Sequence, residues 1–214
     1  MSATKLKILC LHGFTSSAAR LSRQLAPVVQ ASAPWANFTF VDAPFAVEPG
    51  YAWWRAQDRS GPDGDYAVYE GWPKSRTYLH DILREQGPFD GVLGFSQGAV
   101  VTSLLCLMPE FRDKFGFGVI IGGFKARDPE LRRNYEESNP GFDRRSLHVW
   151  GREDDIVPPR ASEKLSEMFK NPELIVHSGG HVIPTAEEEI GKWTAFFRER
   201  AGAKAAREGS KAKY

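Results

Sequence analysis

The feature that most constrains the fold is a regular alternation of short apolar runs with longer segments of helical pattern. The apolar runs have the length of strands, and the segments between them repeat apolar residues at helical spacing. Because this order requires parallel strands joined by crossover helices, we expect an α/β fold with one mostly parallel sheet and helices on both faces. The strands are expected at 5–11, 37–44, 89–95, 115–124, 146–151 and 172–180, and the helices at 16–32, 75–87, 97–108, 159–170 and 185–202.

Length and composition fit one globular domain. The 214 residues are 42% hydrophobic and 26% charged, and the formal net charge is +1. This balance does not indicate a nucleic-acid partner, which would need a strongly basic face. No apolar run is long enough to span a bilayer, and the first residues do not have the pattern of a signal peptide. We expect a cytoplasmic domain over residues 1–203 and a flexible tail, rich in alanine and lysine, at 204–214.

The cysteines and histidines do not indicate a metal site. Cys10 and Cys106, the two cysteines, both lie within apolar patterns, which is typical of buried free thiols. No cysteine or histidine spacing matches a structural zinc site. We therefore expect no metal and no cofactor.

Ser96 lies between two glycines, where a buried strand is expected to end and a helix to begin. Residues 94–98 read Gly-Phe-Ser-Gln-Gly, which matches the pattern G-x-S-x-G. Between a strand and a helix, this pattern predicts a sharp turn that exposes the serine at the helix N-terminus. The structural alternative is an ordinary glycine-rich turn. We interpret Ser96 as a nucleophile.

A serine nucleophile needs a base, and after this kind of turn the chain order is serine, acid, histidine. His148 and His177 lie within apolar strand patterns, which favours a structural role for each. His181 lies in the glycine-rich loop 178–184, where its side chain is free to reach across the edge of the sheet. We expect His181 to be the base.

The acid is expected on the loop that follows the strand at 146–151. Glu153, Asp154 and Asp155 all lie there. Each is alternatively a solvated turn residue or a partner for the dipole of the next helix. The acid would hold the imidazole in one tautomer and stabilise the imidazolium that forms during the reaction.

Two backbone N–H groups are expected to stabilise the oxyanion. One belongs to Gln97, which follows the nucleophile, and the other to Phe14, in the loop after the first strand. Gly13 allows the backbone to turn at that loop. His12 precedes it, and its position at a strand end favours a structural hydrogen-bonding role over that of a catalytic base.

The segment 44–73 is expected to be irregular and is unusually aromatic. One role for it is packing on the sheet, and the other is a lid that lines an apolar acyl pocket above the serine. We expect Tyr51, Trp53 and Trp54 to contact a hydrophobic acyl group. The aromatic residues of the segment are Phe45, Tyr51, Trp53, Trp54, Tyr66, Tyr69 and Trp72.

Four stretches together resemble the FSH family of serine hydrolases, which are small α/β-hydrolases akin to acyl-protein thioesterases and carboxylesterases. They read KILCLHGFTSSA, GPFDGVLGFSQGA, GREDDIVP and GGHVIP, and the resemblance spans residues 5–200. It implies an α/β-hydrolase domain with a triad at Ser96, Asp154 and His181. The acid falls on Asp154 because DDIVP is similar to the D-x-x-V-P segment of α/β-hydrolases, and Asp155 is the alternative.

The resemblance also implies an esterase or thioesterase that forms an acyl-serine intermediate on a hydrophobic acyl group. The stretches EPGYAWW and YEGWPKS look like the fungal branch of the family. Several members of that branch release polyketides from a carrier protein, so an acyl carrier protein is an expected partner. The alternative from another class is a catalytically silent hydrolase fold that binds a ligand or a partner. A metal-dependent hydrolase is disfavoured because the ligand spacing is lacking.

Overall fold

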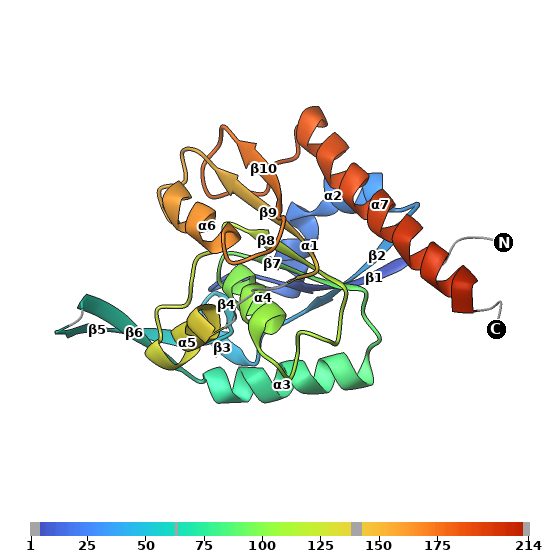
Figure 1. Cartoon of the computed structure of the whole chain (residues 1–214). Coiled ribbons are helices and arrows are strands. Elements are labelled where there is room, and N and C mark those ends of the chain that lie inside the picture. The colour runs from blue at the N-terminus through green and yellow to red at the C-terminus, as the bar shows by residue number, and fades with distance from the viewer. Residues whose placement is uncertain (1–4, 63, 138–142, 212–214) are drawn as a thin grey trace.

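A six-stranded parallel sheet forms the centre of the molecule (Figure 1). The computed structural model describes residues 5–62, 64–137 and 143–211. The strand order is β10-β9-β8-β7-β1-β2, and every neighbouring pair is parallel, which confirms the predicted α/β class. The strands are β1 (Leu6–Leu11), β2 (Ala36–Val41), β7 (Gly91–Phe95), β8 (Phe117–Ile121), β9 (Arg145–Gly151) and β10 (Glu173–His177).

The strands supply side chains to two cores, one on each face of the sheet. In β1, Leu9 and Leu11 belong to one core, whereas Ile8 and Cys10 belong to the other. Successive side chains of a strand point to opposite faces, so an uninterrupted apolar run fills both cores. β7 and β8 are buried along their whole length, which places the end of β7 in a rigid part of the molecule.

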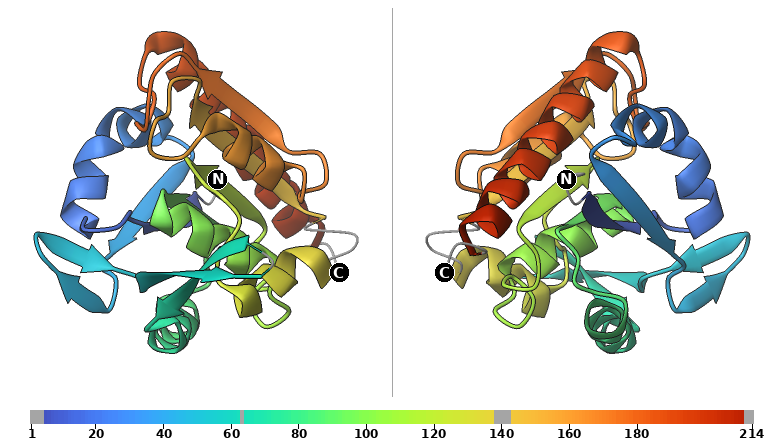
Figure 2. Two further views of the ribbon diagram at one scale, coloured as in Figure 1. Left: turned by 90° about the vertical axis from the view of Figure 1, so that its left-hand side faces the viewer. Right: turned by 90° about the vertical axis from the view of Figure 1, so that its right-hand side faces the viewer.

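Helices cover both faces, as predicted (Figure 2). The core that contains Ile8 also receives side chains from α1 (Ala18–Gln24), α2 (Ala26–Ser32) and α7 (Glu187–Lys211). The core that contains Leu9 receives them from α3 (Trp72–Glu85), α4 (Gln97–Leu107), α5 (Pro129–Glu137) and α6 (Pro159–Ser166). None of the helices in the described residues has the length and apolar character needed to cross a membrane.

The single helix expected at 16–32 is two helices. Ser17 begins α1, and its Oγ accepts a hydrogen bond from the Arg20 N–H at 3.1 Å. α1 ends at Gln24, and Pro27 lies in the first turn of α2. Proline lacks the N–H group, which has no acceptor in a first turn, so Pro27 is accommodated at the start of a second helix rather than kinking one.

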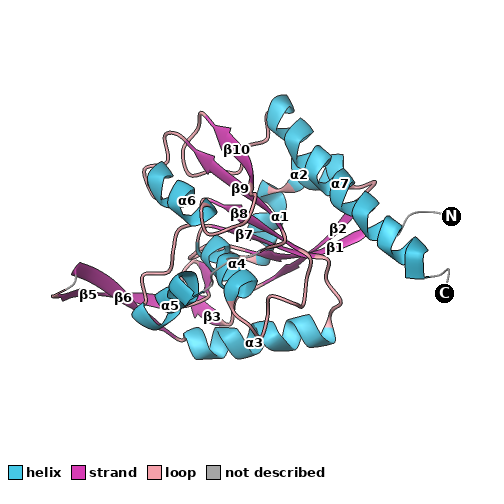
Figure 3. Ribbon diagram, in the orientation of Figure 1, coloured by secondary structure: helices cyan, strands magenta, loops and turns pink. Residues whose placement is uncertain are grey.

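The segment 44–73 contains two antiparallel hairpins, so the expectation of irregular structure is wrong. β3 (Phe45–Val47) pairs with β4 (Gly50–Ala52), and β5 (Arg55–Gly61) pairs with β6 (Gly64–Glu70). The second hairpin projects from the body of the molecule (Figure 3). β5 is mostly polar and exposed, so its sequence lacks the alternation from which a strand is predicted.

Two helical segments differ from the sequence expectation. α5 has no predicted counterpart, and it follows Asp128, whose Oδ1 accepts a hydrogen bond from the Glu130 N–H at 3.0 Å. α7 is longer than the helix expected at 185–202, and it includes residues 204–211 of the expected tail. There the Lys204 Nζ lies 2.8 Å from the Asp90 Oδ2, which connects α7 to the loop before β7. The rest of the expected tail lies outside the described residues.

His148 is a buried titratable group that makes stability depend on pH. It lies in β9, and its ring centroid is 4.6 Å from that of Phe169. Burial lowers the pKa of His148 to about 3, because the imidazolium would lose its solvation in the core. In the unfolded chain the pKa is about 6.5. The unfolded state therefore takes up the proton first, and stability is lost as the pH falls from about 6.5 to about 3.

The variant His148→Leu removes this group. Between pH 7 and pH 5, we expect its free energy of unfolding to fall by about 2 kcal/mol less than that of the wild type. Denaturant unfolding at the two pH values measures the difference. Equal pH dependence in the two proteins would contradict the prediction.

Candidate active site

Ser96 lies at the sharp junction between β7 and α4. Its backbone has φ 54° and ψ −115°, a conformation that residues with a side chain rarely adopt. A Cβ at Gly94 would lie 2.0 Å from the Gly98 carbonyl oxygen, and a Cβ at Gly98 would lie 2.1 Å from the Leu11 carbonyl oxygen. Both glycines of the G-x-S-x-G pattern are therefore needed for α4 to pass this close to β7 and to the end of β1. The half-buried Ser96 begins α4, where the helix dipole favours negative charge.

His12 fixes the peptide that carries the Phe14 N–H. Its Nε2 accepts a hydrogen bond from the Ala43 N–H at 3.0 Å, so the ring proton is on Nδ1, which donates to the Gly13 carbonyl oxygen at 2.7 Å. Burial lowers the pKa of His12 and favours this neutral form. The carbonyl and the N–H of a trans peptide point in opposite directions, so the Phe14 N–H is turned away from His12. The structural role expected for His12 is confirmed.

Asp154, which is buried, and His181, which is partly buried, form a hydrogen-bonded pair. The His181 Nδ1 donates to the Asp154 Oδ2 at 2.7 Å, and the exposed fractions of the two side chains are 14% and 1%. The other carboxylate oxygen, Oδ1, accepts hydrogen bonds from the Ile156 and Val157 N–H groups at 3.0 and 2.7 Å. With Nδ1 donating, the His181 Nε2 is an acceptor, and it has no partner among the described residues. The carboxylate thus fixes both the tautomer and the orientation of the imidazole.

Ser96 and His181 flank the same short segment at the end of β8. The Ser96 N–H donates to the Ile121 carbonyl oxygen at 2.9 Å. The next residue, Gly122, has φ 58°, and a Cβ there would lie 2.8 Å from the His181 Cε1. The structure therefore brings the serine and the histidine to the carboxyl edge of the sheet, although the described residues include no hydrogen bond from the Ser96 hydroxyl to the imidazole. Such a bond is often long before substrate binds.

The other acids and bases considered from the sequence lie elsewhere. They are Glu153, Asp155, His148 and His177. The two acids are exposed, and neither side chain has a hydrogen bond or ion pair within the part of the chain that the structure describes. His148 is enclosed within β9, and the His177 Nδ1 accepts a hydrogen bond from the Gly179 N–H at 3.2 Å. Asp154 is thus the one of the three adjacent acids that contacts His181.

The Gln97 side chain holds the segment between the two hairpins. Its Oε1 accepts a hydrogen bond from the Trp53 N–H at 2.8 Å, and its Nε2 donates to the Trp54 carbonyl oxygen at 2.9 Å. The sequence indicates a role for the Gln97 backbone alone. The signal for a side-chain role is the position itself, because Gln97 is a large polar residue at the start of a helix that is otherwise apolar on most of its circumference.

Trp53 and Trp54 are buried in the core, so their side chains are not available to a substrate, in contrast to the expectation. Their exposed fractions are 0% and 2%. The Trp53 Nε1 donates to the His12 carbonyl oxygen at 2.9 Å, and Trp54 stacks on Tyr69 with ring centroids 4.3 Å apart. Tyr51, the third residue expected to contact the acyl group, is 36% exposed. Most of the large aromatic side chains in this segment therefore pack on the body of the protein.

Comparison with known proteins gives a match over most of the chain. A family model described as serine hydrolase (FSH1) matches residues 1–193. The esterase CG5412 of Drosophila melanogaster is 31% identical, over 92% of this chain and 75% of its own length. The esterase OVCA2 of Danio rerio is 28% identical, over 92% of this chain and 99% of its own length.

Solved structures resemble the fold. A carboxylesterase from Mesorhizobium loti superposes with a TM-score of 0.66 at 17% identity, covering 91% of this chain and 89% of the other. Arabidopsis thaliana SOBER1 superposes with a TM-score of 0.65 at 18% identity, covering 92% of this chain and 99% of the other. With the parallel sheet and its two helical layers, this likeness confirms the predicted α/β-hydrolase fold.

The variant Gln97→Leu tests whether this side chain holds the Trp53–Trp54 segment. It leaves a buried N–H and a buried carbonyl without partners, and each such group costs about 1–3 kcal/mol. We expect the free energy of unfolding to fall by about 3 kcal/mol, measured by denaturant unfolding with tryptophan fluorescence. The control Gln30→Leu, at an exposed position of α2, should change it by less than about 0.5 kcal/mol. If the two variants were equally stable, the side chain would not hold the segment.

Proposed function

Because the chain belongs to the serine hydrolase (FSH1) family, we propose that it hydrolyses esters or thioesters of hydrophobic carboxylic acids through an acyl intermediate on Ser96. One observation carries the proposal. The part-buried Asp154–His181 hydrogen bond of 2.7 Å leaves the His181 Nε2 unpartnered in the described residues, beside the same segment of β8 that Ser96 contacts. A serine hydroxyl becomes a useful nucleophile only when a base of this kind takes its proton.

In the first half of the reaction the acyl group moves to the enzyme. The Ser96 Oγ bonds to the acyl carbon while its proton moves to the His181 Nε2, and a tetrahedral intermediate with a negative oxygen results. The bond from the acyl carbon to the leaving oxygen or sulfur then breaks. His181 returns the proton to the leaving group, which departs as an alcohol or a thiol.

In the second half, water releases the acid. The water oxygen bonds to the acyl carbon and its proton moves to His181, which then protonates the Ser96 Oγ as the ester bond to serine breaks. The products are the carboxylic acid and the free enzyme. In both halves the imidazolium is stabilised by the Asp154 carboxylate, whose second oxygen is already occupied by two backbone N–H groups.

Two backbone N–H groups are assigned to the oxyanion in this proposal. The Gln97 N–H lies in the first turn of α4, where the helix has no acceptor for it. The Phe14 N–H is turned away from His12 by the bond from His12 to the Gly13 carbonyl oxygen. Both groups are held by contacts made before substrate binds, which is the condition for strong stabilisation of the transition state.

The same two N–H groups serve an ester and a thioester, because the oxyanion forms on the carbonyl oxygen in both cases. A thioester carried by an acyl carrier protein would therefore react by the same steps, and its product would be a free acid. Assays with matched oxygen and sulfur esters of one acyl group measure the preference.

The experiment compares two neighbouring aspartates. Asp154→Asn removes the charge that orients and stabilises the imidazole, and we expect kcat for a p-nitrophenyl ester to fall by about a thousandfold or more. Asp155→Asn, at the exposed neighbouring position, should change kcat by less than about twofold. Labelling by a fluorophosphonate should follow the same order, and Ser96→Ala should give no labelling.

Three outcomes would contradict the proposal. The first is a folded wild-type protein that neither reacts with the probe nor hydrolyses esters, which would favour a silent ligand-binding fold. The second is labelling that persists in Ser96→Ala, which would place the nucleophile elsewhere. The third is an Asp155→Asn variant that loses more activity than Asp154→Asn.

A further inference from the structure

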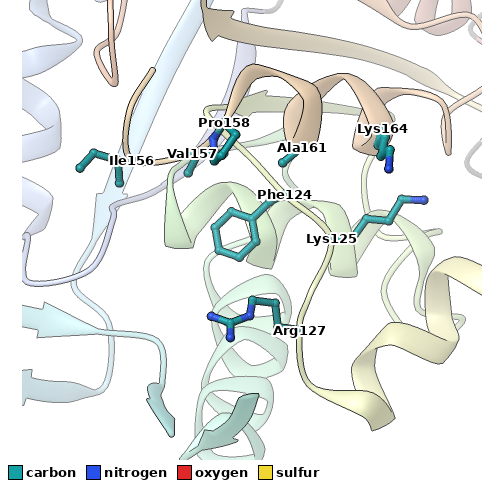
Figure 4. Close-up of a pocket in the computed structure, with 8 residues that line it drawn as sticks. All are labelled: Phe124, Lys125, Arg127, Ile156, Val157, Pro158, Ala161 and Lys164. Carbon is teal, nitrogen blue, oxygen red and sulfur yellow. The ribbon is translucent and has the colours of Figure 1, made fainter. Parts of the chain in front are cut away.

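An apolar cleft with cationic groups at one end opens between the loop after β8 and the start of α6 (Figure 4). Its volume is about 440 Å³. We propose that this cleft binds the acyl chain of the substrate and that Lys125 and Lys164 bind an anionic group, a carboxylate in the simplest case, at the far end of that chain. The inference rests on the proposed function and adds a substrate class to it. The lining residues are Phe124, Lys125, Arg127, Ile156, Val157, Pro158, Ala161 and Lys164.

The near end of the cleft is lined by residues that adjoin the acid–base pair. Ile156 and Val157, on one wall, donate the backbone hydrogen bonds that hold the Asp154 Oδ1. The opposite wall begins two residues after Gly122, where a Cβ would touch His181. In the proposed complex, an acyl group bonded to Ser96 passes the acid–base pair to enter this cleft.

The walls are apolar and held together. The Ser162 Oγ donates to the Gly123 carbonyl oxygen at 2.7 Å, which connects α6 to the loop after β8. In Figure 4 the Phe124 ring lies between Pro158 and Arg127 in the view, in the middle of the cleft. Ile156 is 68% exposed, so a hydrocarbon chain in the cleft would cover apolar surface that water now contacts. This part of the cleft suits a hydrocarbon chain.

The far end carries positive charge without compensation from the protein. Figure 4 shows the Lys125 and Lys164 side chains together at the end opposite Ile156. Neither lysine has an ion pair or side-chain hydrogen bond within the residues that the structure describes. Arg127, by contrast, already lies 2.8 Å from the Asp58 carboxylate of the projecting hairpin. The two free ammonium groups are therefore complementary to an anion on the ligand.

The length of the cleft indicates the length of the chain. From Pro158, which precedes α6, to Lys164 the helix rises about 9 Å, which an extended chain spans in roughly seven single bonds. An anion held by the half-buried Lys125 and the exposed Lys164 gains about 1–1.5 kcal/mol, or roughly a tenfold preference. The substrate class is thus an ester or thioester of a medium-length acid whose far end carries a second acidic group.

The test uses two p-nitrophenyl esters of the same chain length, the monoester of octanedioic acid and the ester of octanoic acid. For the wild type at low salt, we expect kcat/KM of the octanedioate to exceed that of the octanoate by about tenfold. Added salt should reduce this ratio, because it screens charges that are partly exposed. The hexanedioate and decanedioate monoesters locate the best length.

Lysine variants assign the preference to the cleft. In the double variant Lys125→Gln and Lys164→Gln, the ratio of octanedioate to octanoate should fall to about one. The control Lys170→Gln changes an exposed lysine after α6 that does not line the cleft, and it should keep both the ratio and the activity. A wild-type ratio of one, or a ratio that the double variant retains, would overturn the inference.

Binding separates this inference from the proposed function. Titration of the Ser96→Ala variant with each ester, followed by calorimetry, needs no turnover, and we expect the octanedioate to bind about tenfold more tightly than the octanoate. Equal affinities would overturn the subsite, even in an active enzyme. A tenfold difference in affinity for a wild type without esterase activity would instead refute the proposed function and leave the anion subsite standing.

Discussion

The strained backbone of Ser96 is the constraint on which the rest of the site depends. Its positive φ lies where α4 passes so close to β7 and to the end of β1 that no Cβ fits at Gly94 or Gly98. This crossing fixes the serine at a helix N-terminus, directly before Gln97, the first residue of α4. A buried parallel strand on one side and a wholly buried helix on the other hold it in place. The strain is thus maintained by two of the most rigid elements of the fold.

The aromatic segment connects the two assigned oxyanion donors. Trp53 donates its N–H to the Gln97 side chain and its indole Nε1–H to the His12 carbonyl oxygen. The Ser75 hydroxyl, on α3, donates to the Trp53 carbonyl oxygen. The buried Trp53 therefore contacts three elements: Gln97 at the sharp turn between β7 and α4, the loop that carries Phe14, and α3 in the outer layer. We infer that this part of the segment positions the oxyanion donors, whereas the cleft beside Ile156 receives the acyl chain.

The sequence predicts the fold class and the sharp turn at Ser96 well, because both follow from local patterns. Buried parallel strands read as apolar runs, and the two glycines flanking Ser96 are required by backbone contacts that no other residue permits. The residues alone do not decide which acid pairs with the histidine, because Glu153, Asp154 and Asp155 are adjacent acidic residues in the same expected loop. Their burial differs only in the folded loop, where the backbone N–H groups of Ile156 and Val157 surround the Asp154 carboxylate. Likewise, composition does not distinguish a buried Trp53 from one that lines a pocket. The polar strand β5 is not predicted because its residues do not alternate between apolar and polar.

The structure of the protein after reaction with a fluorophosphonate tests the central claim most directly, namely that Ser96, the Asp154–His181 pair and two backbone N–H groups act on one substrate carbon. The account predicts phosphorus bonded to the Ser96 Oγ, with the phosphonyl oxygen within hydrogen-bond distance of the Phe14 and Gln97 N–H groups. It also predicts the His181 Nε2 beside the serine oxygen, with the bond to Asp154 intact. A phosphonyl oxygen that faces solvent, or a phosphonyl group bonded to another residue, would contradict it.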